Sequence, residues 1–129
     1  MTKEEERELR AQLARLQQEH RDLDAAIAAT LVRHVRASDV VARIGGDEFV
    51  VLLWNVTDTD AAAKASALEA AVYATPVRWG ASTLVVGASA GLSIIGPLDT
   101  SAEVLARADA AMYARKMERR QALDGRFTR

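Results

Sequence analysis

Hydrophobic and polar positions divide the chain into one long helical segment and a region of alternating strands and helices. Residues 3–31 contain neither glycine nor proline, and their many Glu, Arg, Gln, Leu and Ala residues favour helix. One stripe in this segment recurs at alternating intervals of four and three residues, as in a coiled-coil seam: Leu9, Leu13, Leu16, His20, Leu23, Ile27 and Thr30. The stripe predicts a dimeric coiled coil, with a helix that folds onto its own domain as the alternative.

Shorter apolar runs follow a break in the pattern at residues 37–39. Two of these runs, 39–44 and 49–54, flank a pair of glycines and predict a β-hairpin. The other expected elements are a helix over 61–74 capped by Asp58 and Asp60, one or two strands over 77–86, a strand over 88–95, and a helix over 102–121 capped by residues 99–101. The tail, 124–129, has no strong pattern.

The composition narrows the classes of function. The chain has 129 residues, with 17 basic side chains, 18 acidic side chains and no cysteine. The balanced charge predicts no nucleic acid and no membrane as partner, because such binding needs an excess of Lys and Arg on one face. A chain without cysteine has no disulfide and no thiolate zinc site, which fits a cytoplasmic location. A separate leading helix would leave fewer than about a hundred residues for a core, and such small cores are marginal without oligomerisation.

Positive charge gathers toward the C-terminal end. After residue 106 the chain has three acidic residues, Asp109, Glu118 and Asp124. The basic residues in the same region are more numerous: Arg107, Arg115, Lys116, Arg119, Arg120, Arg126 and Arg129. Such a run is usually the solvated face of a helix, and a phosphate-binding site is the functional alternative.

The predicted hairpin tip holds the residues best suited to chemistry. Gly45 and Gly46 let the backbone approach a phosphate closely. The adjacent carboxylates of Asp47 and Glu48 can hold a hard divalent cation such as Mg²⁺. An ordinary surface turn uses the same residue types, so the hairpin alone leaves a plain turn and a metal-nucleotide site as alternatives.

Three segments, in order along the chain, carry a family resemblance. They are residues 38–49, which end in Gly45-Gly46-Asp47-Glu48-Phe49; residues 86–91, which end in a Ser-x-Gly; and residues 108–116, which contain an Ala-Asp-x-Ala-hydrophobic-Tyr pattern and end in Lys. Together they resemble the GGDEF family, the diguanylate cyclases of bacterial signalling, over roughly residues 27–121. The resemblance implies an α+β fold: a partial GGDEF-type (nucleotidyl cyclase-like) antiparallel sheet packed by helices, with a long N-terminal coiled-coil helix. The implied division is 1–31 for that helix, 32–123 for the partial GGDEF domain and 124–129 for a tail.

The resemblance also implies roles for the hairpin residues. Asp47 is similar to the family's metal ligand and Glu48 to its adjacent catalytic carboxylate. Together they would hold Mg²⁺, which orients the attack of one GTP on another to form cyclic di-GMP. Gly45 and Gly46 would lie against the triphosphate.

Two further pairs of residues match family positions. Lys116 and Arg120 align with cations that contact nucleotide phosphate. Arg36 and Asp39 resemble the family's product-inhibition motif, in which a guanidinium and a carboxylate grip cyclic di-GMP.

The chain also departs from the family. It shows no counterpart of the family's opening strand, which supplies a second metal ligand, or of the Asn that recognises guanine. His20 and Arg21 stand where the family has Gly-Asp, and an Arg side chain carries only donors, so it cannot accept hydrogen bonds from guanine N–H groups. Arg119 and Gln121 stand where Gly and Asn are usual. Without a central strand, a sheet has unpaired edges that a partner chain or another strand order must cover, unless the sequence is part of a longer domain.

The resemblance to the family, together with the positions that differ from it, therefore predicts a protein of cyclic di-GMP signalling that is catalytically impaired. It would act as a homodimeric module that binds GTP or cyclic di-GMP and dimerises through the N-terminal helix. An active diguanylate cyclase and a dimerisation scaffold without a ligand are the alternatives.

Overall fold

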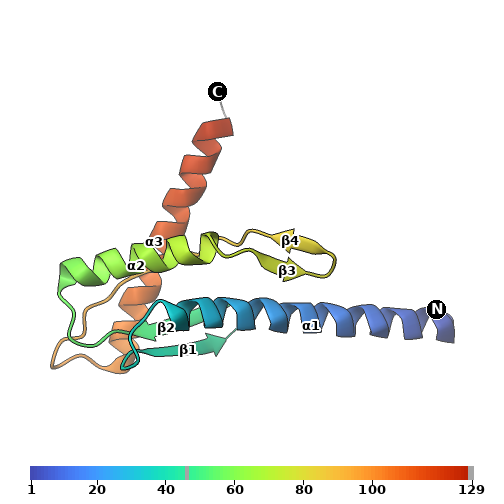
Figure 1. Cartoon of the computed structure of the whole chain (residues 1–129), viewed down its shortest axis with the longest axis horizontal. Coiled ribbons are helices and arrows are strands. Elements are labelled where there is room, and N and C mark those ends of the chain that lie inside the picture. The colour runs from blue at the N-terminus through green and yellow to red at the C-terminus, as the bar shows by residue number, and fades with distance from the viewer. Residues whose placement is uncertain (46, 128–129) are drawn as a thin grey trace.

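The computed structural model describes residues 1–45 and 47–127, and its elements largely follow the predicted order. The strands form two separate antiparallel hairpins, β1–β2 and β3–β4 (Figure 1). The fold is α+β with a long N-terminal helix, as predicted. In chain order, the elements are α1 (Lys3–Arg33), β1 (Val40–Gly45), β2 (Glu48–Leu52), α2 (Asp58–Tyr73), β3 (Val77–Trp79), β4 (Ser82–Leu84) and α3 (Ser101–Phe127).

Side-chain caps fix where the helices begin. At the start of α1, the Thr2 hydroxyl accepts from the backbone N–H of Glu5 at 3.1 Å, and the Glu5 carboxylate accepts from the Thr2 N–H. The prediction that Asp58 and Asp60 cap α2 is wrong, because the Thr57 hydroxyl accepts from the Asp60 N–H at 3.1 Å. The two aspartates lie in the first turn instead, where the helix dipole favours negative charge.

The two ends of the predicted seam on α1 have different surroundings. Leu31 is buried together with residues of α2, Ile27 packs against the same cluster, and Thr30 is buried with its hydroxyl donating to the Ala26 carbonyl at 2.9 Å. The N-terminal part of α1 extends away from the rest of the chain (Figure 1), and its seam residues Leu9, Leu13 and Leu16 are exposed. The side chain of His20 lies outside what the structure describes. The N-terminal end of the seam is thus available to a partner helix.

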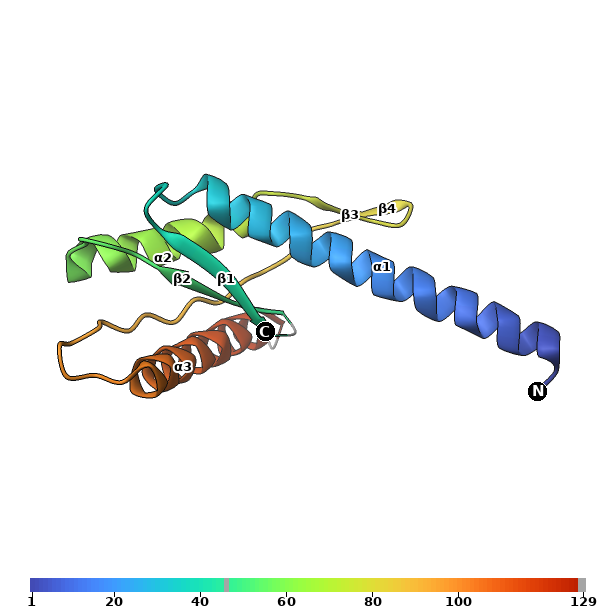
Figure 2. The same ribbon diagram turned by 90° about the horizontal axis from the view of Figure 1, so that it is seen from below.

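The β1–β2 hairpin lies between two helical layers (Figure 2). Its register pairs Val41 with Val51 and Arg43 with Phe49. Val41, Phe49 and Val51 pack against the core cluster of Leu31, Leu68 and Val72, which are supplied by α1 and α2. Since side chains alternate along a strand, the opposite face of the hairpin is turned toward α3.

Residues 85–95 form no strand, which corrects the predicted strand over 88–95. The segment runs as extended chain past α3 (Figure 2), and Val86 and Ala88 pack against the same core cluster as the hairpin. Within the described residues, no backbone hydrogen bond joins this segment to a neighbouring strand. An alternating apolar pattern favours extended chain, but a ladder also needs a neighbour, and each hairpin pairs only within itself.

The last helix, α3, runs further than predicted and takes in most of the tail. It begins after Thr100, whose hydroxyl accepts from the Glu103 N–H at 3.2 Å, within the predicted cap. Along its apolar face, Met112 is half-buried while Leu105 is exposed. In the described part of the chain, no helix has a stretch that is long and apolar enough to cross a membrane.

Candidate functional site

The β1–β2 turn carries the acidic residues of the predicted site. Gly45 ends β1 with a φ of 151°, a conformation that side-chain-bearing residues rarely adopt, and it pairs with Glu48 across a register shift. The predicted phosphate-contacting residue Gly46 lies outside the described residues. Asp47 and Glu48 follow directly and are both exposed. The tip thus presents two adjacent carboxylates to solvent.

These two carboxylates suit a metal that is held jointly with a nucleotide. Among the described residues, no three His, Cys, Asp or Glu side chains gather in a way that could hold a metal ion, so Asp47 and Glu48 would be its only such ligands there. Mg²⁺ commonly binds through one or two carboxylates and completes its octahedral shell with water and substrate phosphates. Asp47 and Glu48 therefore fit a magnesium ion that arrives with phosphate oxygens, and the metal would neutralise phosphate charge there.

Arg36 and Asp39, the predicted cyclic di-GMP pair, lie together at the base of the hairpin. Asp39 accepts from the Arg36 backbone N–H at 2.9 Å, from the Arg36 Nε at 3.5 Å and from the Trp54 backbone N–H at 3.1 Å. The Arg36 guanidinium also donates to the Trp54 carbonyl. The Asp39 side chain is only 1% exposed, whereas the Arg36 guanidinium is half-exposed. The guanidinium is therefore the part of the pair that a ligand can reach.

The surroundings of Asp39 favour its charged form. Burial by itself would raise the pKa of this carboxyl. Hydrogen bonds from the backbone N–H groups of Trp54 and Arg36, and from the Arg36 guanidinium, outweigh burial and lower the pKa below its ordinary value of 3.8. The carboxylate ties the α1–β1 connection to the end of β2, so its charge contributes to the stability of the hairpin.

We expect Asp39→Asn to destabilise the protein at neutral pH and to lose that effect in acid. A carboxyl whose pKa is lowered by folding contributes stability above its unfolded pKa, here about 3.8, and loses it as the pH falls through the folded pKa. The urea unfolding midpoints of wild type and variant should differ at neutral pH and begin to converge only as the pH falls below 3.8. Asp58→Asn, at an exposed carboxylate, is the control; equal pH dependence in both variants would contradict this role for Asp39.

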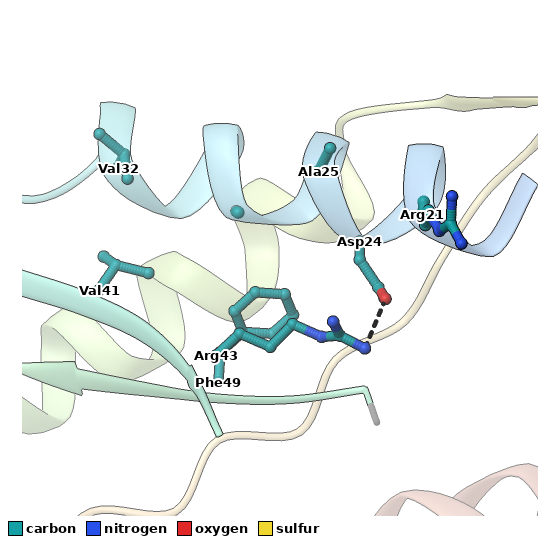
Figure 3. A pocket seen from close by; sticks show the side chains of 8 residues that line it. Arg21, Asp24, Ala25, Val32, Val41, Arg43 and Phe49 are labelled. Carbon is teal, nitrogen blue, oxygen red and sulfur yellow. Dashed lines mark ion pairs between the residues drawn. The ribbon is translucent and has the colours of Figure 1, made fainter. Parts of the chain in front are cut away.

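A groove lies between α1 and the hairpin (Figure 3). Its volume is about 290 Å³, and its charged residues include an ion pair of 3.0 Å between the Arg43 guanidinium and the Asp24 carboxylate. Arg21 is exposed and also lines the groove. Its other lining residues are apolar: Ala25, Ala28, Val32, Val41 and Phe49. Sequence reasoning did not identify this groove, because it arises where two elements meet.

The predicted phosphate cations lie on a different element from the hairpin tip. Lys116 and Arg120 are exposed on α3, and their side chains make no hydrogen bond or ion pair within the described residues. Figure 1 shows the C-terminal end of α3 rising away from the hairpin. The side chains of Lys116 and Arg120 are therefore open to an anion.

Glu69 on α2 organises a cluster that sequence reasoning missed. Its side chain is 6% exposed and lies 3.4 Å from an Arg115 terminal nitrogen and 3.7 Å from one of Arg119. It also accepts from the Ala90 backbone N–H at 2.9 Å. The hydrogen bond to Glu69 is the main cause that raises the pKa of Arg115. The sequence does contain an indication of this cluster, because Glu69 is a charged residue next to Leu68 on the buried face of α2.

The sequence matches one protein family over most of its length. Residues 23–122 match the family described as diguanylate cyclase, GGDEF domain. Over 91 residues the chain is 38% identical to the probable diguanylate cyclase DgcE of Escherichia coli (strain K12), spanning 70% of this chain and 8% of DgcE. Over 102 residues it is 36% identical to the response regulator PleD of Caulobacter vibrioides, spanning 77% of this chain and 22% of PleD. The chain thus spans a small part of these relatives.

Solved structures show the same likeness. The diguanylate cyclase SiaD of Pseudomonas aeruginosa, solved with its activator SiaC, matches with a TM-score of 0.69 and 30% identity, over 74% of this chain and 37% of SiaD. A structure comprising only the GGDEF domain of YfiN (TpbB) from Pseudomonas aeruginosa matches with a TM-score of 0.62 and 37% identity, over 75% of this chain and 58% of that domain. With its glycine and carboxylate hairpin and its α+β arrangement, this chain belongs to the GGDEF domain family of diguanylate cyclases and represents part of such a domain.

Proposed function

We propose that this chain is a catalytically impaired GGDEF module that binds GTP or cyclic di-GMP with Mg²⁺ and works in cyclic di-GMP signalling in the cytoplasm. The observation that carries the proposal is the exposed pair Asp47 and Glu48 at the tip of the β1–β2 hairpin. Two adjacent carboxylates suit a Mg²⁺–phosphate complex. The half-exposed guanidinium of Arg36 and the unpaired cations Lys116 and Arg120 offer further contacts to phosphate.

The proposal of impaired catalysis rests on the small number of metal-binding side chains at the hairpin tip. In-line displacement at a phosphate is commonly supported by two metal ions, which stabilise the attacking and leaving oxygens. Asp47 and Glu48 have no third metal-binding side chain grouped with them in the described part of the chain. In the groove beside the hairpin, Arg21 carries only donors and cannot accept from the N–H groups of guanine. Binding requires fewer of these groups than catalysis, so it is the better supported function.

Calorimetric titration of the whole chain with GTP and with cyclic di-GMP tests the proposal. We expect binding of GTP that depends on Mg²⁺ and that weakens roughly tenfold or more in Asp47→Asn, because one of the two metal-binding carboxylates is lost. Mg²⁺ alone should give little heat, since the nucleotide phosphates complete its shell. No cyclic di-GMP should form from GTP.

The matched control is Asp58→Asn, which removes an exposed carboxylate from the first turn of α2 and should leave binding unchanged. Cyclic di-GMP formation by the unmodified protein that Asp47→Asn abolishes would identify an active cyclase. Flat titrations with both nucleotides would instead favour a scaffold without a ligand. Binding that is indifferent to Mg²⁺ would place the nucleotide away from the hairpin tip.

We also propose that α1 dimerises through its protruding end. The supporting observation is the exposed row Leu9, Leu13 and Leu16, which follows the coiled-coil spacing and lies outside the packed part of the chain. The row is short, and isolated helices of fewer than about 15 residues are marginal in water, so this contact gains from any second contact between the two copies.

A further inference from the structure

Trp54 is a large aromatic residue that the fold anchors beside Arg36 and leaves 52% exposed. Its backbone is held on both sides, because its N–H donates to the Asp39 carboxylate at 3.1 Å and its carbonyl accepts from the Arg36 guanidinium. Within the described residues, its indole N–H has no hydrogen-bond partner. Single exposed aromatic residues are common at protein surfaces, so the significance of Trp54 depends on its neighbours.

These neighbours meet at the base of the β1–β2 hairpin, the end opposite its tip. Val40 begins β1 and pairs with Leu52, the last residue of β2, and Trp54 follows two residues later. Asn55 then adopts a left-handed conformation with a φ of 51°, where the chain turns toward α2. Figure 1 shows the α1–β1 connection, which carries Arg36, at this same end of the hairpin. The base therefore gathers a guanidinium, an indole and the half-exposed side chain of Val40.

The Asp39 carboxylate is already occupied by the chain itself. It accepts from two backbone N–H groups and from the Arg36 guanidinium, and its side chain is almost fully buried. A ligand at this surface therefore meets the guanidinium of Arg36 and the indole of Trp54. A guanidinium pairs with phosphate oxygens, and an exposed aromatic ring offers a flat face on which a nucleobase can stack.

The charge of the surface favours a phosphodiester over a triphosphate. Asp39 offsets the positive charge of Arg36 at 3.5 Å, so the pair presents little net charge. A triphosphate carries several negative charges close together and is better held with Mg²⁺, for which the carboxylates of the hairpin tip are suited. Each phosphate of cyclic di-GMP carries a single negative charge and lies next to a guanosine. One guanidinium beside one indole therefore matches half of this molecule.

We infer that Trp54 is a base-stacking residue for cyclic di-GMP, with one guanine lying on its indole while a phosphate of the same molecule pairs with Arg36. The inference rests on the proposed function and deepens it by assigning one of the two nucleotides to the base of the hairpin. Trp54 lies outside the segments 38–49, 86–91 and 108–116 that carry the family resemblance. The tip and the base are separated by the 6 residues of β1, which span about 20 Å.

The fluorescence of Trp54 tests this contact directly. The chain has two tryptophans, so Trp79→Phe leaves Trp54 as the only indole. We expect cyclic di-GMP to quench this emission in a saturable way, with the dissociation constant that calorimetry gives. In a chain that keeps Trp79, the same quenching should be present with Trp54 and lost in Trp54→Ala. GTP with Mg²⁺ should leave the emission unchanged, because it is expected at the tip.

Calorimetric titration of the variants gives a second reading. Trp54→Ala should weaken binding of cyclic di-GMP roughly tenfold, the usual effect of losing one stacked base, while binding of GTP with Mg²⁺ stays the same. Trp54→Phe keeps a flat ring and should retain most of the affinity. Both substitutions keep the backbone contacts to Arg36 and Asp39, so the urea unfolding midpoint should stay near that of the wild type.

The matched control is Tyr73→Ala, which removes another exposed aromatic side chain at the far end of α2 and should leave both affinities unchanged. Binding of cyclic di-GMP that does not alter the emission of Trp54 would overturn the inference, as would equal affinity in Trp54→Ala, and the proposed function would stand in either case. Binding of GTP without binding of cyclic di-GMP would also overturn it. If neither nucleotide bound, the inference and the proposed function would fail together.

Discussion

Gly91→Ala is expected to lower the free energy of unfolding by about 3 kcal/mol, at the upper end for an added methyl group in a packed site. A Cβ atom at residue 91 would lie 2.7 Å from the Met112 Cα and closer still to the Ala108 carbonyl oxygen. These are backbone atoms of α3, so no side chain can turn aside to make room. The whole helix must shift, and the hydrogen bonds that Arg107 of α3 donates to Ser93 and Ile94 would loosen with it.

Gly87→Ala is the matched control for this prediction. It lies in the same segment, and a Cβ atom there would meet nothing within 4 Å. The control should be neutral or slightly stabilising, because alanine reduces the conformational freedom of the unfolded chain. Urea unfolding followed by circular dichroism measures both variants. Equal stability of the two variants would show that α3 does not depend on close approach at Gly91.

The local pattern of the sequence predicts the existence of the hairpin well, but it predicts the ends of the two strands less well. Apolar runs on either side of Gly45 predict strands over 39–44 and 49–54, and the structure has Val40–Gly45 and Glu48–Leu52. The shift toward the tip arises because the unusual φ of Gly45 lets it pair with Glu48. Such a conformation depends on the backbone and leaves little trace in hydrophobicity.

Pairings between distant residues account for what the sequence could not predict. The segment 88–95 has a strand pattern, yet strand formation depends on a neighbour that no local window contains. The proximity of Arg36 and Asp39 follows from their spacing, whereas the contact of Asp39 with Trp54 joins residues 15 apart. The pair of Glu69 with Arg115 spans 46 residues. For Glu69, the sequence offered only a charge in an apolar stripe.

Glu69→Ala is the second substitution with a large expected effect, again about 3 kcal/mol of unfolding free energy. The Glu69 side chain is almost fully buried, and it accepts hydrogen bonds from Arg115 and from the Ala90 N–H. Its loss leaves that N–H without a partner and two guanidinium groups without their shared counter-charge. Breaking a fully buried ion pair costs about 3–5 kcal/mol, but these arginines are partly exposed and can turn toward water, which places the effect at the lower end.

Glu118→Ala separates this buried carboxylate from an ordinary ion pair. Glu118 also lies near Arg115, at 3.6 Å, but its side chain is 69% exposed, and exposed pairs contribute less than about 1 kcal/mol. Urea unfolding should therefore show a large loss for Glu69→Ala and almost none for Glu118→Ala. Exchange of the Ala90 amide should accelerate only in Glu69→Ala, because only Glu69 accepts from it. If both variants unfolded at the same urea concentration, Glu69 would contribute no more than a surface charge, and another contact would have to hold α3 against α2.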